Sequence, residues 1–100
     1  MDKNNAIKIA GIYAQAVRNK FNNNRVILFG SYARGNFNED SDIDIAVILK
    51  DYDNLLDTQL ELMRLRRKID TRIEPHPFRE GEFDISNPLV YQIMKYGLEI

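Results

Sequence analysis

The chain has 100 residues, a formal net charge of −1 and no cysteine. This length suits one folded domain, and the balanced charge gives no general attraction to nucleic acid or to an anionic membrane. The lack of cysteine excludes disulfides, cysteine-ligated zinc and a thiol nucleophile. No apolar run approaches the ~20 residues of a membrane span, and the polar first residues are unlike a signal peptide. We therefore expect one domain, residues 1–100, in the cytoplasm.

The first half of the chain predicts a helix followed by a strand. Apolar residues recur at spacings of three and four over residues 7–21, which is typical of an amphipathic helix. Asn4 or Asn5 is its expected cap, and the asparagines at 22–24 follow its end. Residues 25–29, in which four apolar residues follow Arg25, then predict a short buried strand.

A turn and a second strand come next. Gly30 stops the first strand, and a brief helical turn is expected from Ser31. A polar loop occupies residues 36–41. Residues 43–49 predict a second buried strand, because the residues after Asp44 are apolar and mostly β-branched.

The second half predicts two more helices and one more strand. Residues 55–68 present a broad apolar face and predict a long helix; the face consists of Leu55, Leu56, Leu60, Leu62, Met63 and Ile69. Residues 69–76 alternate between apolar and polar, which predicts a half-buried strand. The prolines at 75 and 77 place this strand at a sheet edge or mark its end. Asn87-Pro88 opens a last helix and Gly97 closes it. The alternation of helices and strands predicts the α/β (α+β) class, with helices packed on a small mixed sheet.

The chemistry is concentrated between the first two strands. Asp42 and Asp44 are two residues apart at the start of the second strand, so their side chains share a face, roughly 6.5–7 Å apart. Two acids on one face of a buried strand are costly unless a cation lies between them. Mg²⁺ prefers carboxylate and phosphate oxygens, and the Gly30-Ser31 turn is a suitable phosphate cradle. The sequence therefore predicts a metal-dependent nucleotide site.

This arrangement resembles the signature of the DNA polymerase beta nucleotidyltransferase superfamily, and more narrowly its small stand-alone branch, the minimal nucleotidyltransferases. The matching residues are Gly30, Ser31, Ala33, Arg34, Gly35, Ser41, Asp42, Ile43 and Asp44. The resemblance implies ATP as substrate and two Mg²⁺ ions held by Asp42 and Asp44. It also implies that the chain transfers AMP to a hydroxyl group.

A third carboxylate is expected on the third strand, where it would bind the metal nearer the acceptor hydroxyl and assist its deprotonation. Glu74 and Asp70 are both candidates, but they lie about 13 Å apart along a strand and cannot serve one metal pair. We choose Glu74, whose backbone Pro75 restrains, and keep Asp70 in reserve. His76 is interpreted as an ordinary turn or edge-strand histidine, because no ligand partner occurs at a regular spacing from it.

The resemblance assigns phosphate binding to Gly30, Ser31 and Arg34. Gly30 would let the backbone approach the triphosphate, and the Ser31 hydroxyl with nearby amides would hold its oxygens. Arg34 has a second interpretation, an ion pair with Glu39 or Asp40, which the residues alone favour slightly.

The resemblance also implies a partner. Minimal nucleotidyltransferases often pair with a helical HEPN toxin, which they neutralise by adenylylating a tyrosine, by masking it, or both. The first hypothesis is therefore an antitoxin enzyme, and the second is an interaction module that neutralises by binding alone. A third, weaker hypothesis is nucleotidylation of RNA or of a small molecule. The charge balance argues against RNA, and a small molecule would need a pocket that a homodimer would have to build.

Overall fold

The structure is a computed structural model that describes residues 1–22 and 24–100. In chain order its elements are α1 (Lys3–Lys20), β1 (Arg25–Phe29), α2 (Ser31–Arg34), β2 (Ile43–Leu49), α3 (Leu55–Arg66), β3 (Ile73–Arg79), a 3₁₀ helix η1 (Glu80–Glu82), α4 (Pro88–Tyr96) and β4 (Leu98–Glu99). The mixed α and β class is confirmed. Asn23, part of the asparagine run expected after the first helix, lies outside the described residues.

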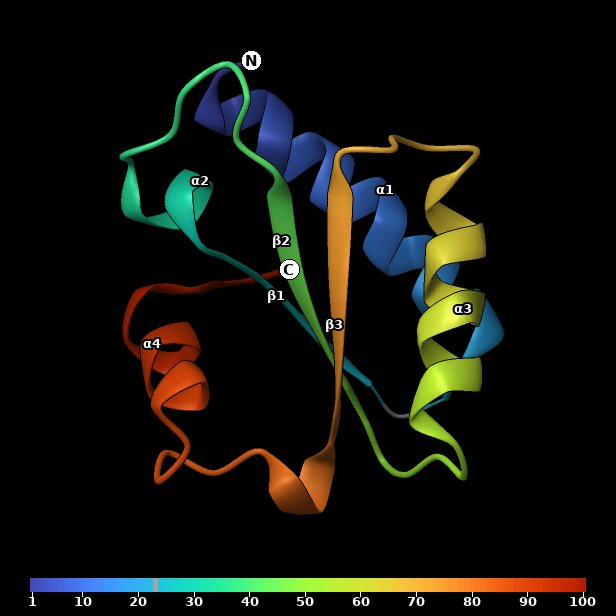
Figure 1. Ribbon diagram of the computed structural model, residues 1–100. Helices are drawn as coiled ribbons and strands as arrows, with labels where there is room; N and C mark the ends of the chain where they lie inside the picture. Colours follow the sequence, from blue (N-terminus) through green and yellow to red (C-terminus); the bar gives the residue numbers. More distant parts are fainter. Residues whose placement is uncertain (23) are drawn as a thin grey trace.

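The strands form one mixed sheet in the order β3-β2-β1-β4. β1 is antiparallel to both β2 and β4, whereas β2 and β3 are parallel. Figure 1 shows β2 and β3 side by side, with α3 on one side of the pair and α4 on the other. The parallel pairing matters for function because it brings the starts of β2 and β3 to the same end of the sheet.

One face of the sheet carries the main hydrophobic core. α1 and α3 pack on this face, and the Tyr13 hydroxyl of α1 donates a hydrogen bond to the Leu62 carbonyl of α3 over 2.8 Å. The buried core here comprises Ala6, Ala10, Tyr13, Ala14, Val17, Val26, Leu28, Tyr32, Ile43, Ile45, Val47, Leu49, Leu62 and Ile73. Burial of these side chains is the main stabilising contribution, at about 25 cal/mol per Å² of apolar surface.

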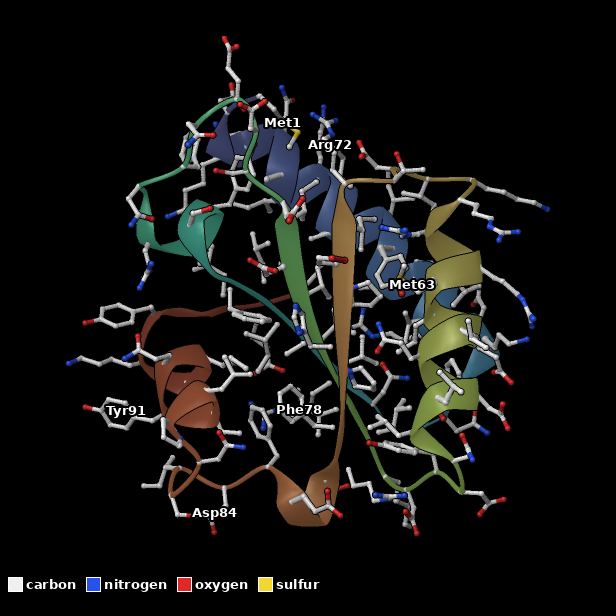
Figure 2. All side chains as sticks on the ribbon, viewed as in Figure 1. Met1, Met63, Arg72, Phe78, Asp84 and Tyr91 are labelled. Carbon is white, nitrogen blue, oxygen red and sulfur yellow. The ribbon has the colours of Figure 1, made fainter. Side chains whose placement is uncertain are left out.

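The opposite face has a smaller core. Ile93 of α4 packs there with four strand residues: Ile27, Phe29, Ala46 and Ile48. Figure 2 shows Phe78 on the same side, between β3 and α4. Asp44 and Glu74, near the starts of β2 and β3, are only half-buried on this face. A polar site can therefore lie beside the smaller core.

Several expected boundaries are confirmed and others are corrected. The structure has both predicted strands 25–29 and 43–49, and the last helix starts after Asn87 and ends before Gly97. The first helix is capped by Asp2, whose side chain accepts the Asn5 amide, and not by Asn4 or Asn5. The helix therefore starts at Lys3, earlier than expected, because the Asp2 carboxylate satisfies a backbone amide of the first turn.

The third strand begins four residues later than predicted, at Ile73 and not at residue 69. The Asp70 carboxylate accepts the backbone N–H of Arg72 over 2.9 Å, and the Ile73 amide donates to the Asp70 carbonyl over 3.2 Å. This local turn competes with strand pairing, as aspartate side chains commonly do. The alternation of residues 69–72 was therefore misleading.

The predicted edge position of the proline-containing strand is confirmed, since β3 is the last strand on its side of the sheet. The Pro75 carbonyl accepts a hydrogen bond from the Gln59 side chain of α3 over 3.0 Å, so its backbone faces away from β2. Proline has no backbone N–H, and at this position none is needed for the hydrogen bonds between β2 and β3.

The apolar face predicted for residues 55–68 is only partly correct. α3 ends at Arg66, and Leu62 is its fully buried leucine, whereas Leu55, Leu56 and Leu60 are exposed. β4 and η1 were not predicted, because a two-residue strand and a single 3₁₀ turn leave little pattern in a sequence. No described helix has both the length and the hydropathy needed to cross a bilayer.

Candidate active site

The residues of the candidate site come from three segments that meet at one end of the sheet. Phe29, the last residue of β1, is paired with Asp44 of β2, and Asp44 is paired with Glu74 of β3. Residues paired across neighbouring strands point to the same face, about 4.7–4.9 Å apart across a strand pair. Asp42 directly precedes β2, and continued alternation of the extended chain would place it on this face as well. The fold thus brings Asp44 and Glu74 together at one end of the sheet, on the α4 side.

Gly30 fits closely against one of these acids. Its backbone has φ 76° and ψ −152°, a conformation that residues with a side chain rarely adopt. A methyl group built at this position would overlap the Oδ2 atom of Asp44. The turn between β1 and α2 therefore needs glycine for two reasons, its conformation and the approach of the carboxylate.

α2 begins directly after this turn, with Ser31 as its first residue. The first backbone N–H groups of a helix have no partner within the helix and can bind anionic oxygens. Figure 1 shows α2 at the same end of the sheet as the start of β2. Ser31 follows Gly30, which approaches Asp44 closely, so the start of α2 lies beside this carboxylate.

The donor set fits a hard divalent cation, which prefers carboxylate oxygens. Asp42 is exposed, and Asp44 and Glu74 are half-buried, so their oxygens can reach solvent and ions. As they stand, no three acidic or histidine side chains among the described residues are close enough together to hold a metal. Binding of a cation by three of these side chains would therefore require them to move closer together.

Asp70, the reserve candidate, lies elsewhere. It precedes β3 in a turn and forms an ion pair with Arg72, with Nη2 2.6 Å from Oδ2 and Nε 2.9 Å from Oδ1. The hydrogen bond from Arg72 lowers the pKa of Asp70 below its ordinary value. The prediction that Asp70 lies on the third strand is therefore wrong, and its carboxylate is already neutralised by a partner.

Arg34 does not form the ion pair with Glu39 or Asp40 that was the alternative expectation for it. No salt bridge in the described part of the chain joins it to Glu39 or Asp40, and its side chain is exposed. It lines a hollow of about 200 Å³ between α2 and α4, together with Phe29, Gly30, Leu89, Gln92 and Tyr96. Because Gly30 lines the hollow and also lies against Asp44, the hollow borders the turn beside that carboxylate.

His76 belongs to this site, which the sequence interpretation missed. Its Nε2 atom lies 3.2 Å from Asp44 Oδ1, across the β2–β3 pair. The expectation of an edge-strand residue is correct, but the contact with Asp44 was not foreseen. A signal was present in the sequence, because Glu74 and His76 are two residues apart and so share one face of the strand, the face on which Glu74 was expected to join the other acids.

Comparison with known proteins identifies the family and several relatives of the chain. The family model of the nucleotidyltransferase domain matches residues 12–97. Two proteins of Methanocaldococcus jannaschii, both named "putative protein adenylyltransferase", are similar to the chain. One is 34% identical over 79 residues, which is 76% of this chain and 77% of that protein. The other is 38% identical over 66 residues, 63% of each.

Solved structures share the fold. A crystal structure described as a putative nucleotidyltransferase from Sulfolobus solfataricus has a TM-score of 0.72 and 25% identity, over 97% of this chain and 80% of that one. A mutant of the MntA–HpeT toxin–antitoxin has a TM-score of 0.67 and 25% identity, over 90% and 69% of the two chains. A toxin–antitoxin with AMP-PNP has a TM-score of 0.64 and 26% identity, over 99% and 72%. With the family match over most of its length and a shared fold, the chain belongs to the nucleotidyltransferase domain family.

Proposed function

We propose that the chain is a Mg²⁺-dependent protein adenylyltransferase that transfers AMP from ATP to a hydroxyl of a HEPN-type toxin and thereby acts as an antitoxin. The observation that carries the proposal is the placement of Asp44 between the Gly30 turn and Glu74. The relatives named as protein adenylyltransferases and the toxin–antitoxin neighbour with AMP-PNP support the substrate and the partner.

In this proposal Asp42, Asp44 and Glu74 would hold Mg²⁺, and a bound Mg²⁺ would supply positive charge beside the phosphate oxygens. The backbone at Gly30, the Ser31 hydroxyl and Arg34 bind the polyphosphate, since amides at a helix start and a guanidinium group both suit phosphate. These groups act mainly by positioning and by charge stabilisation, which supply most of the catalysis in phosphoryl transfer.

The transfer itself forms a bond between the acceptor oxygen and the α-phosphorus, while the bond from that phosphorus to the pyrophosphate oxygen breaks. The acceptor proton passes to the Glu74 carboxylate, which is half-buried on the shared face of the sheet. Pyrophosphate then leaves with the negative charge of the broken bond.

A protein acceptor is consistent with the surface of α4. Tyr91, Met94 and Tyr96 are exposed on this helix, together with Leu89. Figure 2 shows Tyr91 pointing away from the sheet. Apolar side chains that cluster on a short exposed helix are typical of contacts with a partner protein. Because the helix also borders the hollow beside Gly30, a bound partner would lie close to the site.

The test is label transfer from ATP labelled at the α-phosphate, with Mg²⁺ and the helical protein encoded beside this chain. We expect labelled partner with the wild type, none after chelation of the metal, and a loss of about 100-fold or more in Asp44→Asn. Asp53→Asn is a matched control, because it makes the same chemical change on an exposed turn beyond the other end of β2. Equal labelling by wild type and Asp44→Asn would refute a catalytic role.

A second candidate function is neutralisation of the partner by binding alone, which the exposed apolar residues of α4 favour. This function predicts that Asp42→Asn combined with Asp44→Asn leaves toxin neutralisation intact. The adenylyltransferase function predicts that the same double variant loses neutralisation while it still binds the toxin. A growth assay with both proteins expressed, combined with co-purification, separates the two functions.

A further inference from the structure

The most specific contact within the site joins His76 to Asp44. His76 lies on β3 opposite Ala46, and Asp44 lies opposite Glu74, so the two residues are diagonal neighbours on one face of the sheet. Their polar atoms, His76 Nε2 and Asp44 Oδ1, are 3.2 Å apart. An ionised carboxylate can only accept a hydrogen bond, so the imidazole N–H must be the donor.

The imidazole ring is itself held in place. It packs edge-on against Phe29, with ring centroids 5.0 Å apart and an interplanar angle of 65°. Pro75 and Pro77 flank it in the sequence, and each fixes its own φ, which restricts the backbone on both sides of the histidine. The donor therefore occupies a defined position on the sheet, although its side chain is 37% exposed.

Both oxygens of Asp44 are then constrained from different sides. Oδ1 accepts the hydrogen bond from His76, and Oδ2 lies against the Cα of Gly30, where only the absence of a Cβ leaves room. A carboxylate held at both ends cannot rotate freely about its terminal bond. Its second oxygen is directed at the turn where the proposed function places the polyphosphate.

We propose that His76 is a positioning residue that orients the Asp44 carboxylate for cation binding at the Gly30-Ser31 turn. The inference rests on the proposed metal site, and it assigns His76 a role that acts through Asp44. Partners that hydrogen-bond a metal-ligating carboxylate typically contribute about 10–100-fold to metal affinity, because they reduce the ordering that the ion must otherwise impose.

Manganese binding measures this effect without any turnover. Mn²⁺ has an electron paramagnetic resonance signal that is strong when the ion is free and broad when it is bound, so a titration with AMP-PNP present reports affinity. His76→Phe keeps an aromatic ring against Phe29 but has no donor, and His76→Gln supplies an amide N–H at a similar reach. Both replacements are uncharged, so the comparison isolates the hydrogen bond.

We expect His76→Phe to weaken Mn²⁺ binding by about 10–100-fold and His76→Gln to remain within about threefold of wild type. Thermal unfolding and circular dichroism verify that each variant is folded. Wild-type affinity in folded His76→Phe would overturn the inference. So would an equal loss in folded His76→Phe and His76→Gln, because a hydrogen bond would then not be the cause.

Asp44→Asn separates this inference from the proposed function. If Asp44→Asn binds Mn²⁺ as tightly as wild type, the proposed metal site itself is wrong. If Asp44→Asn loses binding while His76→Phe retains it, the metal site stands and only the role of His76 fails.

Discussion

Asp44 and Glu74 occupy directly opposite positions on the parallel strands β2 and β3. The chain separates them by a helix and two loops, and only the pairing of the strands brings them together. A shift of this pairing by one residue would turn Glu74 to the opposite face, because side chains alternate along a strand. The register of one edge strand therefore decides which acid can join Asp42 and Asp44.

This register predicts different results for the two acids near the start of β3. Glu74→Gln should reduce AMP transfer by about 10²–10⁴-fold, since a group that accepts the acceptor proton typically contributes that much. Asp70→Asn should leave transfer near the wild-type rate, because Asp70 lies in a turn and is paired with Arg72. Initial rates with α-labelled ATP measure both. A larger loss in Asp70→Asn than in Glu74→Gln would contradict the assignment.

The turn at Gly30 predicts a second difference, this time between two glycines with positive φ. Gly35→Ala should cost about 1–2 kcal/mol of folding free energy, since its φ is 87° but nothing lies within 4 Å of the added Cβ. Gly30→Ala should cost more and also weaken nucleotide binding, because its methyl group would displace the Asp44 carboxylate. Urea denaturation and AMP-PNP titration measure the two effects. If the two variants bind AMP-PNP equally, the close approach of Gly30 to Asp44 has no role in binding.

Two buried tyrosines predict different effects on stability. Tyr13 donates a hydrogen bond to the Leu62 carbonyl, so Tyr13→Phe should lower the free energy of unfolding by about 1 kcal/mol. The Tyr32 hydroxyl has no hydrogen-bond partner among the described residues, although the side chain is fully buried. Tyr32→Phe should therefore be neutral or stabilising, because it removes an unsatisfied polar group. A large loss in Tyr32→Phe, measured by urea denaturation, would show that this hydroxyl does have a partner.

The ion pair between β1 and β4 predicts a dependence of stability on pH. Arg25 lies 2.8 Å from Glu99, and its hydrogen bond lowers the pKa of that carboxyl below the ordinary value. This contribution is present above the pKa of Glu99 in the unfolded chain and is lost as pH falls through the lower pKa of the folded state. Glu99→Gln should therefore lower the free energy of unfolding near neutral pH by less than ~1 kcal/mol, since the pair is exposed to solvent.

The same variant should unfold like the wild type at a pH below both pKa values, because Glu99 is then protonated in each state. Thermal unfolding at several pH values, at one ionic strength, measures the difference. A difference between variant and wild type that grows as pH falls would have the wrong sign and would exclude this ion pair as its source.

Local pattern in the sequence was sufficient for much of the fold. The strands Arg25–Phe29 and Ile43–Leu49 have the predicted bounds, because short, mostly apolar runs rich in β-branched residues favour a buried strand. The motif that joins Gly30-Ser31 to Asp42 and Asp44 lies within one stretch of the chain. Its geometry depends on the turn and on strand alternation, and both are local properties.

The tertiary structure decided the contacts between segments that are distant in the chain. The parallel pairing of β2 and β3 sets Glu74 opposite Asp44, removes Asp70 from the site and brings His76 to Asp44. The exposure of Leu55, Leu56 and Leu60 was likewise decided by where α3 lies on the sheet. The periodicity of a sequence shows which residues share a face of a helix or strand. Only the packing of the elements determines which residues that face contacts, because the stabilising contacts come from neighbours that are distant in the sequence.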